Sequence, residues 1–384
     1  MRVMNFVAGL LAGACLIAPP AQAADPAKAK SGGDLIYFGT RANVIHAARF
    51  DPLTGRLSPL GQVAALEGPT WLIPDPKARV IYAVNEIGND GKAEGGVTSL
   101  AYDPQTAKLT VLNRVGAVGG GATHLTIDAP SRTLFVSNFG TGHVAAIPFG
   151  VDGHLAPATS SFQEVGSGPN PRQVSAHAHG TALDPSGRYL LSADVGADRI
   201  FVYRFDRAGR RLVHDPAADL ATPPGTGPRH LVFSPNGRFV YAVSELSVET
   251  LAYRWDARRG RLEPLQTLAG KSPGAPPTSQ GGEIAISRDG RFLYATVRGE
   301  DVLVVYAVDS ASGRLTEVQR IPAGAKVPWY IAFDPSQRWL LMAGNPSTTV
   351  RVFKRDAKTG MLSATENSLE VPQPTTVTFV PGRR

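Results

Sequence analysis

Short apolar runs that face each other across a tight turn recur along this chain, and residues 227–246 (GPRHLVFSPNGRFVYAVSEL) show the pattern most clearly. The apolar runs 231–233 and 239–243 flank the turn sequence SPNG (234–237). Proline fixes φ in such a turn, and glycine is free to take a positive φ. The pattern therefore predicts a β-hairpin.

Charged residues gather at one end of this predicted hairpin. A register that pairs Phe233 with Arg238 would place Arg229 opposite Ala242, with Glu245 just beyond the same end. The Pro-Arg-His that enters the hairpin and the Ser-Glu that leaves it would then lie together. Packing of a strand requires no such charges, so this end is the first candidate for chemistry.

The hairpin belongs to a repeat. Each repeat has a turn such as DPSG or SRDG, an arginine, an apolar run such as VIYAV or FLYAT, and two further strand-like segments. Four strands in a repeat of about 50 residues are typical of a β-propeller blade. The turn arginines that mark the repeats are Arg79, Arg132, Arg188, Arg238, Arg291 and Arg338.

Both ends of the chain are left over after six complete repeats. Residues 35–41, 44–50 and 55–63 match a second, third and fourth strand, whereas residues 374–380 match a first strand. Joined, the two ends complete a seventh blade and remove an exposed strand edge. We therefore expect an all-β, seven-bladed β-propeller over residues 33–384, closed by pairing the C-terminal strand with the N-terminal blade. Two β-sandwiches would not explain why the leftover ends complement each other.

Composition supports this fold and narrows the function classes. Of 384 residues, 43% are hydrophobic and 18% charged, and 41 glycines and 31 prolines recur at short intervals, as many strands and turns require. The formal net charge of +7 is scattered instead of gathered in runs. A solvated basic surface is therefore favoured over nucleic-acid binding, and a small anionic substrate remains compatible.

The N-terminus has the composition of a secretory signal. Residues 1–23 contain Arg2, an apolar segment over 6–18 and a terminal Ala-Gln-Ala cleavage site. The apolar segment is too short for a membrane anchor. After cleavage, residues 24–32 would form a flexible leader, and we expect a periplasmic monomer without stable membrane association. Cys15, the only cysteine, is poorly placed for lipid attachment, so the mature chain would hold no disulfide and no catalytic thiol.

The turn arginine also identifies equivalent positions in the blades. Positions nine residues before it and seven residues after it lie at the same end of the two inner strands, so both sets would surround one mouth of the central channel. The first set is Thr70, Thr123, His179, Arg229, Gly282, Trp329 and, from the terminal strand, Thr375. The second set is Arg41, Glu86, Phe139, Val195, Glu245, Arg298 and Asn345.

Charged side chains concentrate at this mouth, as in a binding site. A metal site is disfavoured, because apart from Glu245 and Glu283 no further ligand is in register with the histidines, and we expect no cofactor. Adjacent blades contribute His177 and His179, then Arg229, His230 and Glu245, then Glu283 and Arg298, and the remaining blades add Arg41, Glu86 and His124.

The blade pattern and the sequences HAHG, GPRHLVFSPNGRFVYAVSEL and EIAISRDGRFLYATVRGED resemble the seven-bladed propeller lactonases, a family with bacterial 6-phosphogluconolactonases and fungal carboxymuconate lactonising enzymes. The resemblance covers nearly the whole mature chain. It implies active-site roles for Arg229, Glu245, Arg298 and one histidine of HAHG, and His179 is the histidine in register with Arg229. Relatives commonly carry Pro-Arg where this chain has Pro-Trp-Tyr (328–330). This departure would affect which substrate binds. Export would affect it too, because an exported enzyme does not meet cytosolic sugar phosphates.

These residues would support hydrolysis of a small anionic or sugar-derived lactone. His179 or Glu245 would take a proton from the attacking water, while Arg229 and Arg298 would hold an anionic group or the oxyanion. Glu245 would form an ion pair with one of the two arginines, and the other arginine would pair with an anionic substrate. Other charged residues would bind the substrate, namely Arg41, Glu86, His124, His177, His230 and Glu283.

Alternatives remain open at this point. The same groups could close an unsaturated acid to a lactone, or the propeller could bind a ligand or partner without catalysis. Arg229 and Glu245 could also form a purely structural ion pair. The residues alone do not identify the lactone.

Overall fold

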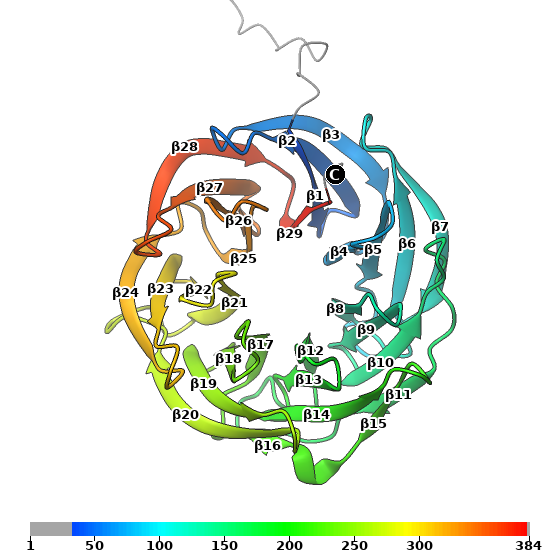
Figure 1. Cartoon of the computed structure of the whole chain (residues 1–384), viewed down its shortest axis with the longest axis vertical. Coiled ribbons are helices and arrows are strands. Elements are labelled where there is room, and N and C mark those ends of the chain that lie inside the picture. The colour runs from blue at the N-terminus through cyan, green and yellow to red at the C-terminus, as the bar shows by residue number, and fades with distance from the viewer. Residues whose placement is uncertain (1–32, 382–384) are drawn as a thin grey trace, which may run out of the picture. The chain divides into compact units, whose positions relative to one another are not determined.

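Residues 33–381 of the computed structural model form seven antiparallel sheets around a central opening (Figure 1). Each sheet has a path of four strands, consecutive in the chain in six sheets, whereas the seventh combines the last strand of the chain with the first three; one sheet has a short fifth strand in addition. The predicted seven-bladed β-propeller is therefore confirmed. The predicted signal peptide and leader, with Cys15, lie outside the described residues. Within the described part of the chain, no helix is long and apolar enough to cross a membrane.

In each blade the four strands lie side by side in order from the channel outward. The innermost strands are β29 (Pro374–Phe379), β4 (Leu72–Pro74), β8 (Ala122–Asp128), β12 (Ala178–Leu183), β17 (Pro228–Phe233), β21 (Gln280–Ile286) and β25 (Pro328–Phe333). The second strands are β1 (Asp34–Thr40), β5 (Val80–Asn85), β9 (Thr133–Asn138), β13 (Tyr189–Asp194), β18 (Phe239–Ser244), β22 (Phe292–Arg298) and β26 (Trp339–Gly344).

The outer half of each blade is built in the same way. The third strands are β2 (Val44–Phe50), β6 (Gly96–Tyr102), β10 (His143–Pro148), β14 (Arg199–Asp206), β19 (Glu249–Asp256), β23 (Val302–Val308) and β27 (Thr349–Arg355). The outermost strands are β3 (Leu57–Ala65), β7 (Leu109–Gly116), β11 (Ser160–Gln163), β15 (Arg211–His214), β20 (Arg261–Ala269), β24 (Leu315–Pro322) and β28 (Leu362–Glu370). A 3-10 turn, η2 (Pro216–Ala218), precedes the short extra strand β16 (Leu220–Ala221).

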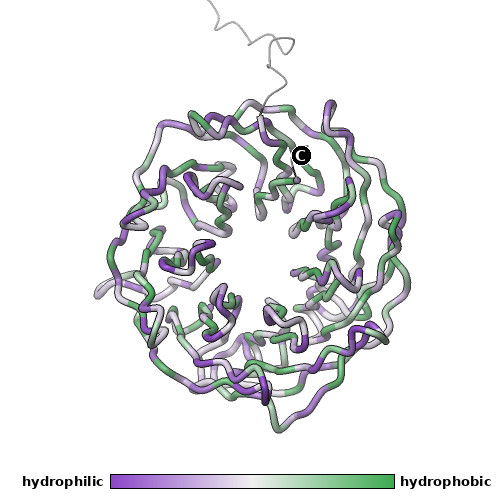
Figure 2. The backbone as a smooth tube through the Cα atoms, viewed as in Figure 1, coloured by the Kyte–Doolittle hydropathy of each residue, from purple (hydrophilic) through white to green (hydrophobic). Residues whose placement is uncertain are grey.

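The apolar runs of the sequence become the second strands. In β5, β9, β18 and β26 every residue is buried, because each strand lies between two neighbouring blades. The outermost strand β28 instead alternates between exposed and half-buried residues along most of its length. Apolar stretches accordingly recur in every blade (Figure 2). The core is therefore a set of apolar layers between neighbouring blades.

The turn arginines join neighbouring blades. Four of the six turn arginines donate a guanidinium hydrogen bond to a backbone carbonyl oxygen at an outer turn of the next blade, which gives these arginines a structural role. The pairs are Arg188 with Ala257, Arg238 with Ala311, Arg291 with Ala357 and Arg338 with Pro52.

The predicted ring closure is confirmed. Strand β29 pairs antiparallel with β1, with Val377 opposite Phe38 and Phe379 opposite Ile36 (Figure 1). The Phe379 ring packs edge-on against Phe50, with 5.5 Å between centroids. The last strand of the chain thus supplies the channel side of the first blade.

The register predicted for the central hairpin is wrong. Strands β17 and β18 pair Phe233 with Val240, because the turn closes with a hydrogen bond from Ser234 N–H to the Phe239 carbonyl (2.9 Å) and is longer than expected. The pairing then shifts so that Arg229 has no partner of its own. Arg229 occupies a β-bulge.

The same bulge recurs in blade after blade. A bulge adds an unpaired residue and re-aims side chains on the bulged strand. In β21 the bulge sets Gly282 and Glu283 against Thr296. Two consecutive residues can therefore face the channel, which strict alternation along a strand forbids. Elsewhere the bulge residues are Thr123, His179, Arg229, Trp329 and Thr375.

Candidate functional site

A pocket of about 240 Å³ opens at the channel mouth that the two sets of positions surround. A narrower recess continues from it toward the channel interior and is lined by Trp71, His230 and Glu283, among others. His179 and Trp329 line both spaces. Further residues of the mouth pocket are Arg41, Glu86, Arg172, Glu245, Gln280 and Arg298.

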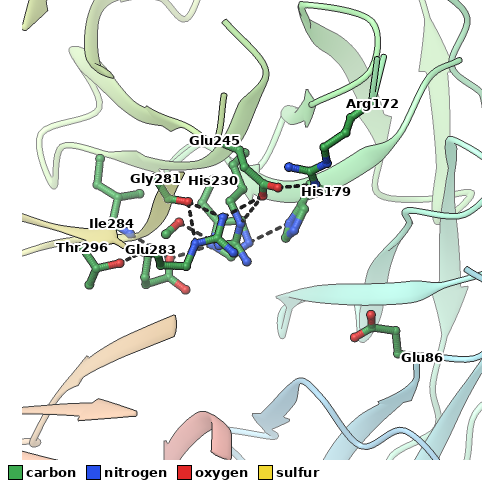
Figure 3. Close-up of polar contacts among 12 residues, drawn as sticks. Glu86, Arg172, His179, His230, Glu245, Gly281, Glu283, Ile284 and Thr296 are labelled. Carbon is green, nitrogen blue, oxygen red and sulfur yellow. Dashed lines mark hydrogen bonds and ion pairs between the residues drawn. The ribbon is translucent and has the colours of Figure 1, made fainter. Parts of the chain in front are cut away.

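Glu245 is the electrostatic centre of the mouth pocket. It lies directly after β18, is almost fully buried, and its Oε2 accepts from Arg229 Nε (2.9 Å) and contacts Arg298 Nη2 (3.1 Å). Its Oε1 accepts from Arg172 Nη2 at 2.5 Å (Figure 3). Burial opposes its charge, but the Arg298, Arg229 and Arg172 guanidiniums outweigh burial and lower the pKa of Glu245 to about 2. Glu245 therefore forms ion pairs with both Arg229 and Arg298, whereas the sequence predicted a pair with only one of them.

Backbone carbonyls of the β21 bulge complete the arginine contacts. Arg229 Nη1 donates to Gly282 O (2.7 Å), and Arg298 Nε donates to Gly281 O (3.0 Å). Burial lowers the pKa of Arg298 to about 10, so it stays protonated at neutral pH. Both guanidiniums lie beside the Trp329 ring, with carbons 5.4 and 4.8 Å from its centroid. The arginines are fixed before any substrate arrives.

Buried histidines lie next to the arginines. His179 Nδ1 is 3.1 Å from His230 Nε2, and His230 Nδ1 is 2.7 Å from Glu283 Oε1 (Figure 3). Burial and the neighbouring Arg229 lower the pKa of His179 and of His230 well below the usual range. Both imidazoles are therefore neutral at physiological pH. Because Nδ1 of His179 is engaged by His230, its Nε2 is the atom left for the pocket.

The opposite side of the mouth carries a weaker ion pair. Arg41 Nη2 contacts Glu86 Oε1 (3.2 Å), and the Arg41 side chain is 39% exposed. Figure 3 shows Glu86 across the opening from the Glu245 cluster. Arg41 also lies 5.0 Å from the centroid of Trp329. Trp329 thus forms an apolar surface bordered by guanidiniums.

A family model described as a lactonase with a seven-bladed β-propeller matches residues 35–379. This chain belongs to that family. The expected resemblance is therefore confirmed over almost the whole described ring.

Several relatives of this chain carry names that describe an activity on sugar lactones. It is 28% identical over 336 residues to 6-phosphogluconolactonase of Bacillus subtilis, covering 88% of this chain and 94% of the relative. It is 32% identical over 266 residues to 6-phosphogluconolactonase of Pectobacterium carotovorum, covering 69% and 76% of the two chains. The solved structure of the periplasmic gluconolactonase of Pseudomonas aeruginosa is 36% identical, with a TM-score of 0.84 over 91% of this chain and 99% of the other.

In this lactonase the predicted residues separate into two groups. His179, Arg229, Glu245 and Arg298 are brought together at the mouth, with His230 and Glu283 behind them and Arg41 and Glu86 opposite. His177 is not part of the pocket lining, because its ring stacks on Phe139 and its Nδ1 lies 2.7 Å from the Phe139 carbonyl oxygen. His124 packs on Trp71 below the pocket and accepts from Thr181 N–H. Neither side chain lines the pocket as predicted.

Arg172 is the site residue that sequence reasoning missed. It lies in the loop between β11 and β12, outside the four-strand repeat, so no reference position identifies it. The loop is held by buried Gln173, whose Nε2 donates to Asp198 Oδ1 (2.7 Å) and to the Val195 carbonyl oxygen (2.8 Å). In residues 33–381, no group of three or more His, Cys, Asp or Glu is arranged to hold a metal ion.

Proposed function

We propose that this protein hydrolyses a small sugar-derived lactone in the mouth pocket. The observation that carries the proposal is a neutral imidazole, His179, beside the guanidiniums that Glu245 holds in place. A base and a preorganised positive surface are the groups that ester hydrolysis needs. Family membership and the names of the relatives support the same reaction class.

The charges at the site assign roles to the residues. His179 Nε2 is the base that takes a proton from the attacking water. Glu245 is excluded from this role, because its pKa of about 2 and its ion pairs make it a poor proton acceptor at neutral pH. The oxyanion that forms at the lactone carbonyl is stabilised by Arg298 and Arg229. Glu245 is the residue that orients these guanidiniums.

The pocket lining suits a polar or anionic lactone. Among the described residues that line the pocket and its recess, four arginines outnumber three carboxylates: Arg41, Arg172, Arg229 and Arg298 against Glu86, Glu245 and Glu283. Trp329, which also lines the pocket, gives the apolar side of a sugar ring an aromatic side chain to contact.

The test is a substrate panel. We expect the chain from residue 24 onward to accelerate hydrolysis of glucono-δ-lactone, 6-phosphogluconolactone or both above the spontaneous rate, as acid release in a pH-stat measures. A muconolactone in the same panel tests the lactonising alternative. No acceleration with any lactone, at protein concentrations in the micromolar range, would contradict the proposal.

Replacing Arg298 by methionine should lower kcat and kcat/KM together by about 10²-fold, the cost of removing one oxyanion donor. The melting temperature should fall less than in a Glu245 variant, because Glu245 keeps Arg229 and Arg172. Arg355→Met is the matched control, since Arg355 is buried between blades and donates to Tyr294 Oη (2.7 Å) away from the pocket. Equal kcat in the two variants would make Arg298 a structural residue.

We also propose that the protein is exported to the periplasm. The composition of residues 1–23 supports this, as does the similarity to a protein named as a periplasmic gluconolactonase. The expected mature form begins at Ala24. Intact-mass measurement of protein from the periplasmic fraction tests it, and a mass that includes acyl chains on Cys15 would contradict it.

A further inference from the structure

We propose that Glu283, His230 and His179 form a proton relay in which the buried carboxylate of Glu283, in the recess behind the mouth pocket, takes up the proton that the attacking water loses. The inference rests on the proposed lactone hydrolysis. His230 and Glu283 are positioning residues in it, because they act through His179. Continuous contacts of 3.1 and 2.7 Å connect the three side chains across strands β12, β17 and β21.

Hydrogen-bond chemistry allows two consistent arrangements of this chain. A neutral imidazole has one N–H donor and one lone pair, so each contact must hold one proton. In the first arrangement Glu283 is ionised, His230 donates from Nδ1, and His179 donates from Nδ1, which leaves a lone pair on His179 Nε2. In the second arrangement Glu283 is protonated, both donors reverse, and His179 carries its proton on Nε2. The protonation state of Glu283 therefore decides whether His179 Nε2 presents a lone pair, as a base, or a proton, as an acid, to the pocket.

Local contacts favour the first arrangement at rest. Ile284 N–H donates to Glu283 Oε1 (2.9 Å), which makes this oxygen an acceptor. Thr296 Oγ1 accepts from Glu283 N–H (2.8 Å) and fixes the backbone at the bulge. The His179 and His230 rings approach over Gly180, where a Cβ would lie 2.6 Å from Cδ2 of His230. A glycine at residue 180 thus permits the close approach that the relay requires.

The reaction balances without an added reagent. Water gives one proton to His179 Nε2 while its oxygen bonds to the lactone carbonyl carbon; the Nδ1 proton of His179 moves to His230 Nε2, and the Nδ1 proton of His230 moves to Glu283. The negative charge has then passed from Glu283 to the oxyanion beside Arg298. When the ring C–O bond breaks, His179 Nε2–H protonates the leaving oxygen and the relay returns to its first arrangement. One water has been added to one ester.

The surrounding charges favour the carboxyl group over either imidazole as the place where the proton rests. Burial raises the pKa of Glu283 to about 7, opposed by Arg229 and His124. Arg229 and Arg298 disfavour an imidazolium at His179 or His230, while Glu245 acts the other way on His230. Tyr330 also faces Glu283, whose charge contributes to raising the tyrosine pKa. No intermediate therefore needs a positively charged imidazole.

The test is Glu283→Gln, whose side-chain oxygen accepts from His230 but cannot take up a proton. We expect kcat to fall about 10²-fold with KM changed less than twofold. In the wild type, kcat/KM should decline as pH falls below about 7, since protonated Glu283 forces the second arrangement. In the glutamine variant this decline should move to lower pH. Glu283→Asp should retain the wild-type pH dependence at reduced kcat.

Controls separate a relay from a structural role. Asp219→Asn breaks another histidine–carboxylate pair, in which His214 Nε2 lies 3.0 Å from Asp219 Oδ2, and should leave kcat and its pH profile unchanged. If Glu283→Gln keeps the kcat and the pH profile of the wild type, the relay is overturned. The proposed function still holds in that case, because the wild-type protein hydrolyses the lactone. If that variant does not fold, rates of the wild type in H₂O–D₂O mixtures decide: a curved dependence on deuterium fraction is expected, and a linear one contradicts the relay.

Discussion

Glu245→Gln should lower kcat by at least 10²-fold and reduce the free energy of unfolding by about 3–5 kcal/mol, the range expected when a buried ion pair loses one partner. Glutamine leaves the guanidiniums of Arg229, Arg298 and Arg172 without a counter-charge. Of these, Arg229 and Arg298 are buried, so water cannot replace the carboxylate. Denaturant unfolding and steady-state kinetics on the same preparations measure both effects.

The stability effect should depend on pH with a definite sign. The folded-state pKa of Glu245 is about 2, below its ordinary value of 4.5, so the carboxylate stabilises the fold at any pH above about 4.5. That contribution, about 3 kcal/mol, should disappear progressively as pH falls toward 2. The stability difference between wild type and variant should therefore shrink on acidification.

A matched carboxylate gives the control for stability. Glu86→Gln removes the partner of Arg41, whose side chain is 39% exposed although that of Glu86 is 6% exposed, and water screens such a pair, so we expect a loss of about 1 kcal/mol. If Glu86→Gln and Glu245→Gln destabilise the protein equally, the central role assigned to Glu245 is wrong.

Deleting residues 372–384 should abolish cooperative folding. The deletion removes strand β29, exposes the inner edge of β1 and takes Val377 out of the apolar layer that contains Phe50. It also breaks the hydrogen bond from Thr378 Oγ1 to the Leu72 carbonyl (3.0 Å) that connects β29 to the next blade. Deleting only residues 382–384 is the control. A single sharp calorimetric transition at the wild-type temperature in the longer deletion would contradict the importance of closure.

Much of the fold follows from local sequence because its signal is repeated. Each blade carries the same turn, arginine and apolar run, so an error in one blade does not change the assignment. The two leftover ends predict the closing pair, because each supplies the strands that the other lacks, and β29 and β1 pair as expected. The mouth residues can be identified in the same way, because positions counted from a turn keep their place around a ring.

The remaining details depend on features that periodicity does not encode. Strict alternation cannot predict that Arg229 and His230 both reach the site, since a bulge breaks the alternation. Nor does sequence spacing reveal that one carboxylate, Glu245, contacts both arginines. Arg172 lies in a loop whose path is fixed by tertiary contacts of Gln173. His177 is not among the residues that line the pocket, because its ring stacks on Phe139, a contact between blades that its position in the sequence does not reveal.

The recurrent bulge has a consequence for how such a protein changes over time. A residue without a cross-strand partner can be exchanged while the neighbouring ladder is retained, and here threonine, histidine, arginine and tryptophan occupy equivalent places in different blades. The backbone ladder on either side of the bulge is therefore the same whichever residue occupies it. New chemistry can be sampled one blade at a time, which makes these positions natural choices for a combinatorial library.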